Sequence, residues 1–429
     1  MTAKDSVSQL LRSEILSVKA IVQLYPVIPA EGGAAGRAAR RPLGRDRDEF
    51  QKVMRDWARI AKAAEDLGYW GIAGIEHHFH SEGYEVAPSP GVVNAWLAAH
   101  TSRINVGTNG YVLGTHDAIR VAEECAMLDH MLEGRFWAGV SRGYQSRWTD
   151  VLGQHLGTPA TLSDGGSADK ENRVIFEEQV ELMLKAWTED SFDFNGAKYQ
   201  VPFPYDAGIT TYPATDTASL MGAVDEVDEN GVIRKISVTP PPYQRPHPPV
   251  FVASSSSEES IRYCARNGFV VTSFSPAAKT EEFAKIYAEE AAKVGHPVPL
   301  GANQAPVRWP HVTESAAAYD QALRDYDADM FENFYAKFFK KKMPVNGDVV
   351  QAIKDSGLFL GGTVDQAKAQ FAAEWEQVPY EYSVLIWHWA QQPTDDLIRE
   401  MELMATKVYP EIGGLSGPQE RPRAQWATT

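Results

Sequence analysis

Residues 69–80 read YWGIAGIEHHFH, and the change of character within this stretch decides the fold. The first seven residues are apolar or glycine, a run that is typical of a strand buried on both faces of a parallel sheet. One carboxylate and three imidazoles follow within five positions, namely Glu76, His77, His78 and His80. Titratable side chains crowded in this way are costly in a core, and the carboxyl ends of parallel strands are where such folds bind ligands. The stretch therefore predicts a strand that leads into a functional site, with a histidine-rich surface loop as the alternative.

The same alternation of apolar runs and amphipathic segments extends outward along the chain. Strand-like runs occur at residues 20–25, 69–75, 104–108, 136–140, 250–253, 269–272, 305–309 and 383–387. Helix-like segments lie between them, which is the pattern of a parallel sheet. Eight strand–helix units predict an α/β fold of the (β/α)8 TIM-barrel class. A doubly wound open sheet is the structural alternative.

Two segments interrupt this alternation, after the fourth and the seventh expected strands. Residues 192–249 contain Asn230-Gly231 between extended runs, which is a two-residue hairpin signal, and they end in proline-rich sequence unfit for a helix. Residues 314–360 are helix-like, and their aromatic side chains between 331 and 339 either cover the mouth of the barrel or pack as helix core. Because the first segment has few apolar residues, we interpret both as insertions into a single domain that spans residues 1–429.

Composition limits the partners. The 429 residues are 44% hydrophobic and 23% charged, which is ordinary for a globular protein. A formal net charge of -16 argues against nucleic acid or an anionic membrane as the main partner. Cys125 and Cys264 are too few for a disulfide framework, which favours a reducing compartment. With no signal-peptide pattern in residues 1–18 and no apolar run of spanning length, we expect a soluble cytoplasmic protein.

Residues 254–260 read SSSSEES and lie between an expected strand and an expected helix. Hydroxyls and free backbone amides at a helix N-terminus make a receptor for a phosphate dianion, although ordinary helix capping explains one of these serines. Arg142 follows the fourth strand and Arg173 begins the next long helix, so either guanidinium is a candidate phosphate ligand. Taken alone, each arginine is equally explained as a surface ion-pair partner.

The histidine cluster permits two chemistries. On an extended chain alternate side chains share a face, which places His78 and His80 on one side and His77 on the other. Paired imidazoles suit zinc, but the residues that follow strands three to five are Asn or Ser, which are poor zinc ligands. We therefore expect no metal, and we expect His77 to donate or accept a proton beside an organic cofactor. Asn109-Gly110, after the third strand, allows the main chain to approach a flat ring closely, with a plain turn as the alternative.

Several segments, in this order, resemble the bacterial-luciferase family of flavin-dependent monooxygenases. The resemblance covers roughly residues 21–409. Its carriers are EHHF (76–79), INVGT (104–108), MLD (127–129) with GRF (134–136), GVSRG (139–143), SSEES (256–260) and GGT (361–363) before a helix. Each motif is weak alone, and the ordered set is specific.

The resemblance implies a (β/α)8 barrel that binds reduced FMN as a diffusible substrate and reacts with O2 through a flavin C4a-hydroperoxide. Together with the absence of a Gly-x-Gly-x-x-Gly fingerprint after a strand, it implies a two-component system in which a separate NAD(P)H:flavin reductase supplies the reduced FMN. The other expected partners are a small organic substrate, O2 and further copies of the chain in a dimer or tetramer. Hydroxylation, Baeyer–Villiger oxidation and N-oxidation all remain open.

The resemblance also assigns residues. His77 matches the catalytic histidine, which either delivers a proton to the distal oxygen or acts as a base toward the substrate. The Asn109–Gly110 bond aligns with a non-prolyl cis peptide under the flavin ring. The expected cofactor-binding residues are Glu76, Thr108, Asn109, Gly110, Arg142, Tyr144, Arg173, Ser256, Ser257 and Ser260.

Departures from the luciferase pattern keep other functions open. Ser141 stands where luciferase has a reactive cysteine, and Ser256 stands where it has a glutamate, so light emission from a long-chain aldehyde is not implied. A deazaflavin (F420) dehydrogenase is the rival within the family, although the acidic chain shows no basic tract for a polyglutamate tail. A zinc hydrolase on the same barrel and a flavin-storage protein are the rivals from other classes.

Overall fold

The structure is a computed structural model that describes residues 17–161, 163–254, 257–338, 345, 347–388 and 391–418. The chain forms two compact units. The first comprises residues 1–110 and 250–429, and the second comprises residues 111–249. The expectation of a single domain stays a prediction. No helix within the described ranges combines the length and the apolar character needed to cross a membrane.

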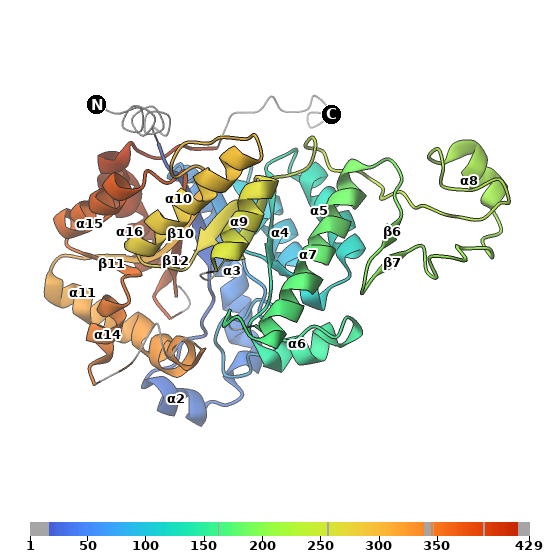
Figure 1. Cartoon of the computed structure of the whole chain (residues 1–429). Coiled ribbons are helices and arrows are strands. Elements are labelled where there is room, and N and C mark those ends of the chain that lie inside the picture. The colour runs from blue at the N-terminus through green and yellow to red at the C-terminus, as the bar shows by residue number, and fades with distance from the viewer. Residues whose placement is uncertain are drawn as a thin grey trace, which may run out of the picture. The chain divides into compact units, whose positions relative to one another are not determined.

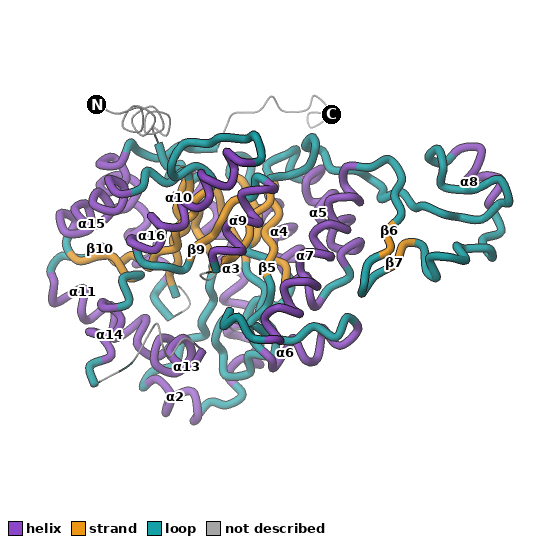
Figure 2. Tube along the Cα trace, in the orientation of Figure 1, coloured by secondary structure: helices purple, strands orange, loops and turns teal. Residues whose placement is uncertain are grey.

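Parallel strands form the centre of the first unit (Figure 2). Seven of them pair in the order β8-β9-β10-β12-β1-β2-β3. Their bounds are β1 (Lys19–Leu24), β2 (Gly71–Gly74), β3 (Asn105–Thr108), β8 (Val250–Ser254), β9 (Val270–Ser273), β10 (Gln304–Val312) and β12 (Tyr382–Trp387). The eighth expected strand is also present, as β5 (Phe136–Ser141) in the second unit. The predicted (β/α)8 barrel class is therefore confirmed.

Each of the eight strands begins and ends within three residues of an expected run. The runs could be recognised in the sequence because their residues are buried almost throughout and are therefore apolar. Two features of the first unit were not expected. β10 continues to Val312, so that His311 lies on a strand, and β11 (Phe359–Gly362) pairs in parallel with β10. The polar residue His311 disguised the end of the strand, and it is buried against the carboxylates of Asp327 and Glu400.

Helices cover these strands, and Figure 1 shows α9 and α10 side by side. In the first unit, the helices outside the expected insertion at residues 314–360 are α2 (Gly33–Ala39), α3 (Arg47–Asp66), α4 (Pro90–Ala99), α9 (Glu258–Asn267), α10 (Ala277–Lys293), α15 (Val364–Gln377) and α16 (Thr394–Leu403). Side chains define several of their N-termini. Asp46 accepts hydrogen bonds from two backbone amides of α3, and Thr363 forms a capping box with Gln366 at α15.

The segment between β10 and β11 is helical, as expected, and aromatic residues anchor it. It contains α11 (Ala316–Ala322), α12 (Ala328–Met330), α13 (Ala336–Phe338) and α14 (Val349–Asp355), with π-helical turns at residues 323–327 and 331–335. Phe331, Phe334 and Tyr335 are buried, while residue 339 lies outside the described residues. Arg37 on α2 donates to Asp329 at 2.6 Å, which fastens the segment to α2.

The second unit contains a helical part and an extended part. The helices are α5 (Ala118–Met131), α6 (Ser146–Leu152) and α7 (Ser167–Thr188), with β4 (Tyr111–Val112) beside β5. The extended part contains β6 (Phe194–Asn195), β7 (Gln200–Val201) and α8 (Thr215–Met221), and Figure 1 shows α8 away from α5, α6 and α7.

The hairpin expected around Asn230-Gly231 is present in a wider form. Val227 and Ile233 form an antiparallel bridge, and Gly231 has a φ of 76°. The turn is not the expected two-residue type, because the Asp228 side chain accepts hydrogen bonds from the amides of Asn230 and Val232 and so organises a longer loop.

Candidate active site

The loop after β2 folds back on itself and brings several titratable side chains of the first unit close together. The His77 amide donates to the carbonyl of Ala87 at 3.0 Å, and the Gly83 amide donates to the carbonyl of His80 at 2.9 Å. Phe79 and Glu85 both have positive φ, at 64° and 45°. These turns return the chain toward β2, and they bring Glu85 beside His77.

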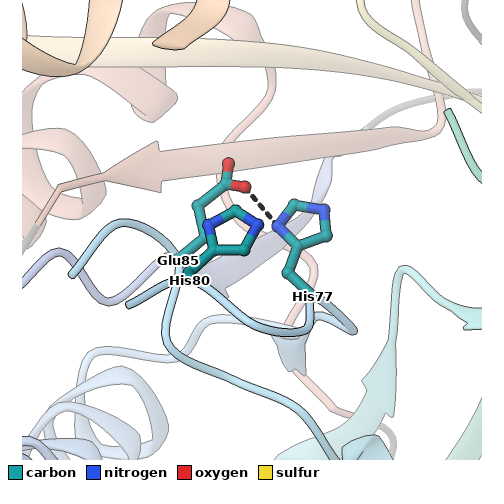
Figure 3. Close-up of side chains that lie close together, drawn as sticks. All are labelled: His77, His80 and Glu85. Carbon is teal, nitrogen blue, oxygen red and sulfur yellow. Dashed lines mark ion pairs between the residues drawn. The ribbon is translucent and has the colours of Figure 1, made fainter. Parts of the chain in front are cut away.

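His77 and Glu85 form a buried imidazole–carboxylate pair (Figure 3). His77 Nδ1 contacts Glu85 Oε2, and both side chains are buried. The ring of His80 stacks on that of His77, with centroids 5.6 Å apart and planes 11° apart. The rings of Tyr25 and His77 are nearly perpendicular, with centroids 6.0 Å apart. Burial and the nearby charge of Glu85 raise the pKa of Tyr25. A carboxylate on one ring nitrogen orients an imidazole for proton transfer, which is the role expected of His77.

The expected alternation of side chains along residues 76–80 is wrong. His78 Nε2 lies 2.9 Å from Glu76 Oε1, as two side chains on one face would. His80 instead joins His77, because the positive φ of Phe79 breaks the extended conformation on which the alternation depended.

The ligand atoms of His77, His80 and Glu85 all lie within 4.8 Å of one another, a separation that a metal site requires. The direct contact between the carboxylate and His77 Nδ1 accounts for this closeness without an ion. No fourth histidine, cysteine, aspartate or glutamate among the described residues joins the group. Two histidines and one carboxylate match the ligand types of a catalytic zinc site, and the contact between His77 and Glu85 also forms an acid–base pair.

The residues after β3 present polar groups that a planar cofactor would satisfy. The Asn109–Gly110 peptide bond is cis, as the resemblance implied. Asn109 Nδ2 donates to Gln23 Oε1 at 2.9 Å. The other amide atoms of this pair, Asn109 Oδ1 and Gln23 Nε2, are buried and have no hydrogen-bond partner among the described residues. One acceptor and one donor left over in a buried place fit the polar edge of a flavin ring.

Thr108 and Glu76, which were also expected to bind the cofactor, are engaged within the protein. The Thr108 hydroxyl donates to the carbonyl of Gly74 at 3.1 Å, which ties β3 to β2. Glu76 pairs with His78 and is buried. Both residues therefore support the loop and the sheet that carry the site.

In the second unit, Arg142 and Arg173 are both buried, and Tyr144, which lies between them in sequence, is partly buried. The Arg142 guanidinium donates to Asp169 Oδ1 at 2.6 Å and to Asn172 Oδ1 at 2.9 Å. Burial and the nearby charge of Arg173 lower the pKa of Arg142, against the opposing effect of Asp169. Two guanidinium groups are thus buried in this unit, and a guanidinium is a common ligand of phosphate.

The serine loop belongs to the first unit. Ser257 caps α9, accepting a hydrogen bond from the Ser260 amide at 3.4 Å, and Ser260 is buried. This is the capping role considered for one serine of the run. Ser256 lies outside the described residues.

Sequence reasoning missed Glu85 and the buried polar residues beyond it, which are Asp327, Tyr335, His311, His388 and Glu400. His388 directly follows β12 and His311 lies near the end of β10, so the rule that led to His77 would have found both. Nothing in the sequence marks Glu85, because a turn and not a strand end places it.

The fold and this site define a TIM-barrel protein with an acid–base centre at the carboxyl end of β2. The sequence profile of the luciferase-like monooxygenases matches residues 27–382. The chain therefore belongs to the luciferase-like monooxygenase family, as the motifs indicated, and this membership supports an oxidoreductase activity.

Individual relatives agree with this assignment. The chain is 26% identical to the alkanal monooxygenase alpha chain of Photobacterium leiognathi over 253 residues, which are 58% of this chain and 58% of that relative. The matched region is thus little more than half of the relative's length.

Solved structures share the fold. The oxygenating constituent of 3,6-diketocamphane monooxygenase of Pseudomonas putida, a type II Baeyer–Villiger monooxygenase in complex with FMN, has a TM-score of 0.67 at 17% identity, covering 94% of this chain and 100% of that one. An F420-dependent secondary alcohol dehydrogenase has a TM-score of 0.61 at 12% identity, covering 92% and 99%. At these identities the likeness concerns the fold alone.

Proposed function

We propose that the protein is the oxygenase of a two-component system, which takes reduced FMN from a separate NAD(P)H:flavin reductase and uses O2 to oxygenate a small organic substrate. The observation that carries the proposal is the buried His77–Glu85 pair at the end of β2 in a chain of the luciferase-like family. A storage protein has no need of an imidazole oriented by a buried carboxylate.

Different residues of the chain would bind different parts of the flavin. The unsatisfied amide atoms of Asn109 and Gln23 would hold the polar edge of the flavin ring, with the Asn109–Gly110 backbone beneath it. Arg142 and Arg173 would hold the phosphate by charge-assisted hydrogen bonds. Bound reduced FMN supplies the electrons that activate O2.

His77 would exchange a proton with the reacting atoms. Glu85 stabilises the protonated imidazole and fixes which ring nitrogen faces away from it, so the pair serves either a proton donor or a base. The aromatic residues of the segment between β10 and β11 would keep water out of the site. The centroid of the Phe334 ring lies 5.3 Å from that of His80 and 5.7 Å from that of Tyr84. Exclusion of water protects a reactive oxygen species from hydrolysis and stray protonation.

An F420-dependent dehydrogenase is the second candidate, because a protein with that cofactor shares the fold over 92% of this chain. Two properties separate the candidates. An oxygenase binds reduced FMN and reacts with O2, whereas the dehydrogenase binds F420 and exchanges hydride without oxygen.

Anaerobic binding titrations with reduced FMN, reduced riboflavin and F420 test the proposal. We expect reduced FMN to bind most tightly, and we expect Arg142→Ala to weaken reduced FMN at least tenfold more than reduced riboflavin, since only FMN carries the phosphate. Arg120→Ala, on the exposed face of α5 in the same unit, is the matched control and should change neither affinity. Equal losses for both flavins would remove Arg142 from the phosphate site, and tight binding of F420 alone would replace the proposed function with the second candidate.

A further inference from the structure

A continuous line of polar side chains begins at His77 and leads away from the β2 loop within the first unit. Glu85 contacts His77 Nδ1 through Oε2 and accepts a hydrogen bond from the Tyr335 hydroxyl through Oε1, at 3.3 Å. The same hydroxyl lies 3.4 Å from His388 Nε2. Tyr335 therefore joins the catalytic loop to the residue that follows β12.

The line continues beyond His388. His388 Nδ1 lies 2.7 Å from Asp327 Oδ1, and Asp327 Oδ2 lies 2.8 Å from His311 Nε2. His311 Nδ1 lies 3.0 Å from Glu400 Oε2 on α16. All of these side chains are buried.

Every internal member of the line except Tyr335 uses one atom on one side and a different atom on the other. Each imidazole uses both ring nitrogens, and Glu85 and Asp327 each use both carboxylate oxygens. The single hydroxyl of Tyr335 donates in one direction and accepts in the other. A group that gains a proton at one atom can therefore release one at another, which is what a proton relay requires.

The far end of the line meets a pocket. Glu400 and Gln392 line a surface pocket of about 620 Å³, together with Asp325, Tyr326 and Asp396. Gln392 Nε2 donates to Glu400 Oε1 at 2.9 Å, which holds the carboxylate at the pocket wall. A pocket of this volume admits water, so Glu400 can exchange protons with solvent.

We propose that Glu85, Tyr335, His388, Asp327, His311 and Glu400 form a proton relay that connects His77 to this pocket. The proposal rests on the proposed function in one respect, since it assumes that His77 gains or loses a proton in the reaction. A site closed to water needs such a route, because a proton must cross the protein while bulk solvent stays out.

The electrostatics of the line agree with a stored proton. Burial lowers the pKa of His311, but the carboxylates of Glu400 and Asp327 more than compensate and raise it to about 10. Burial raises the pKa of Asp327, and the two histidines that it contacts lower it to about 2. At neutral pH His311 is therefore a cation between two carboxylates.

A purely structural role predicts different behaviour. The same contacts fasten the insertion to the barrel, since Asp327 and Tyr335 belong to the insertion while His311 and His388 belong to barrel strands or their ends. Replacing one member of a purely structural network lowers only stability. Replacing one member of a relay also prevents proton transfer between its two ends.

Tyr335→Phe cuts the line at its middle while it keeps the ring in place. Tyr319→Phe is the matched control, because it removes another buried hydroxyl of the insertion that donates to the Phe359 carbonyl, outside the line. The first measurement needs no flavin. It follows the ring nitrogens of His77 and His388 by NMR of histidine-labelled protein across pH, with signals assigned from single His→Gln variants.

In the wild-type protein we expect the titration curve of His77 to show a second step at the pH where His388 titrates, and the reverse for His388. Titrating groups joined by a relay share their protons, so each curve reports both groups. Tyr335→Phe should abolish the shared steps and Tyr319→Phe should keep them. Independent titrations in the wild type, or shared steps that survive Tyr335→Phe, would overturn the relay. Should Tyr335→Phe fail to fold, Glu400→Gln makes the same test from the other end, and an unchanged His77 titration would then overturn it.

The second measurement uses reduced FMN and O2. We expect Tyr335→Phe to return bound flavin to the oxidised form at least tenfold more slowly, with an unchanged affinity for reduced FMN, and we expect added imidazole to restore much of the rate by carrying protons. A rate within twofold of the wild type, or a loss that imidazole does not restore, would contradict the relay. A wild-type protein that does not bind reduced FMN would refute the proposed function instead, and the flavin-free titration would still decide the relay.

Discussion

At the level of single residues, the proposed chemistry depends on the contact between His77 Nδ1 and Glu85 Oε2. A buried carboxylate holds the ring in one orientation and stabilises its charged form. Proton transfer by a positioned imidazole contributes roughly 10²–10⁴-fold to a rate.

His77→Ala should therefore lower turnover by about 10²–10⁴-fold and leave reduced FMN binding within threefold, since the ring is not a ligand of the phosphate. His78→Ala is the comparison, because His78 pairs with Glu76 and not with Glu85, and we expect it to cost less than tenfold. Steady-state turnover with authentic substrate, alongside an anaerobic binding titration, provides the measurement. Equal losses in the two variants would remove His77 from its special role.

The sequence predicts His77 because a strand end supplies it, and it predicts the cis bond at Asn109–Gly110 because the resemblance extends to that turn. It does not predict Glu85, whose position depends on positive φ at Phe79 and at Glu85 itself. It also does not predict that His388 and Asp327, which are 61 residues apart, would share a hydrogen bond of 2.7 Å. Contacts of this kind arise from the closure of the barrel and leave no local pattern.

At the level of elements, buried apolar runs made the strands predictable. The eight barrel strands follow from this pattern, whereas β11, which contains two glycines, and the end of β10, which contains His311, do not resemble it. Helix ends were predictable to within a few residues where a capping side chain stands before the first turn, as Asp46 does before α3.

The capping box at the start of α15 gives a prediction at this scale. Thr363→Ala removes the side-chain acceptor for the Gln366 amide, and we expect it to lower the free energy of unfolding by about 1 kcal/mol. Thr363→Ser keeps the hydroxyl and should lower it by less than half as much. Urea unfolding of the three proteins at one pH measures this, and an unchanged Thr363→Ala would show that the box adds nothing to stability.

At the level of the whole molecule, the buried His311–Asp327 pair makes stability depend on pH in two windows. The pKa of His311 is raised from 6.5 to about 10, so its contribution is complete below pH 6.5 and is lost as pH rises toward 10. The pKa of Asp327 is lowered from 3.8 to about 2, so its contribution is complete above pH 3.8 and is lost as pH falls toward 2.

Asp327→Asn tests this dependence. We expect it to lower the free energy of unfolding by about 3–5 kcal/mol between pH 4 and 6.5, because it removes the buried carboxylate that His311 and His388 share. The difference from the wild type should shrink below pH 4 and above pH 6.5, as the wild-type pair loses its own charges. Urea unfolding across pH measures the difference, and a constant difference throughout would show that the pair is not ionised as described.

We propose that this barrel binds reduced FMN beside His77 and directs its reaction with O2. Rapid mixing of the enzyme and reduced FMN with oxygenated buffer, followed by absorbance, tests it most directly. We expect a transient species that is neither reduced nor oxidised FMN, and we expect it to outlast the oxidation of free reduced FMN because the site excludes water. Oxidation at the rate of the free flavin, with no transient species, would contradict the claim.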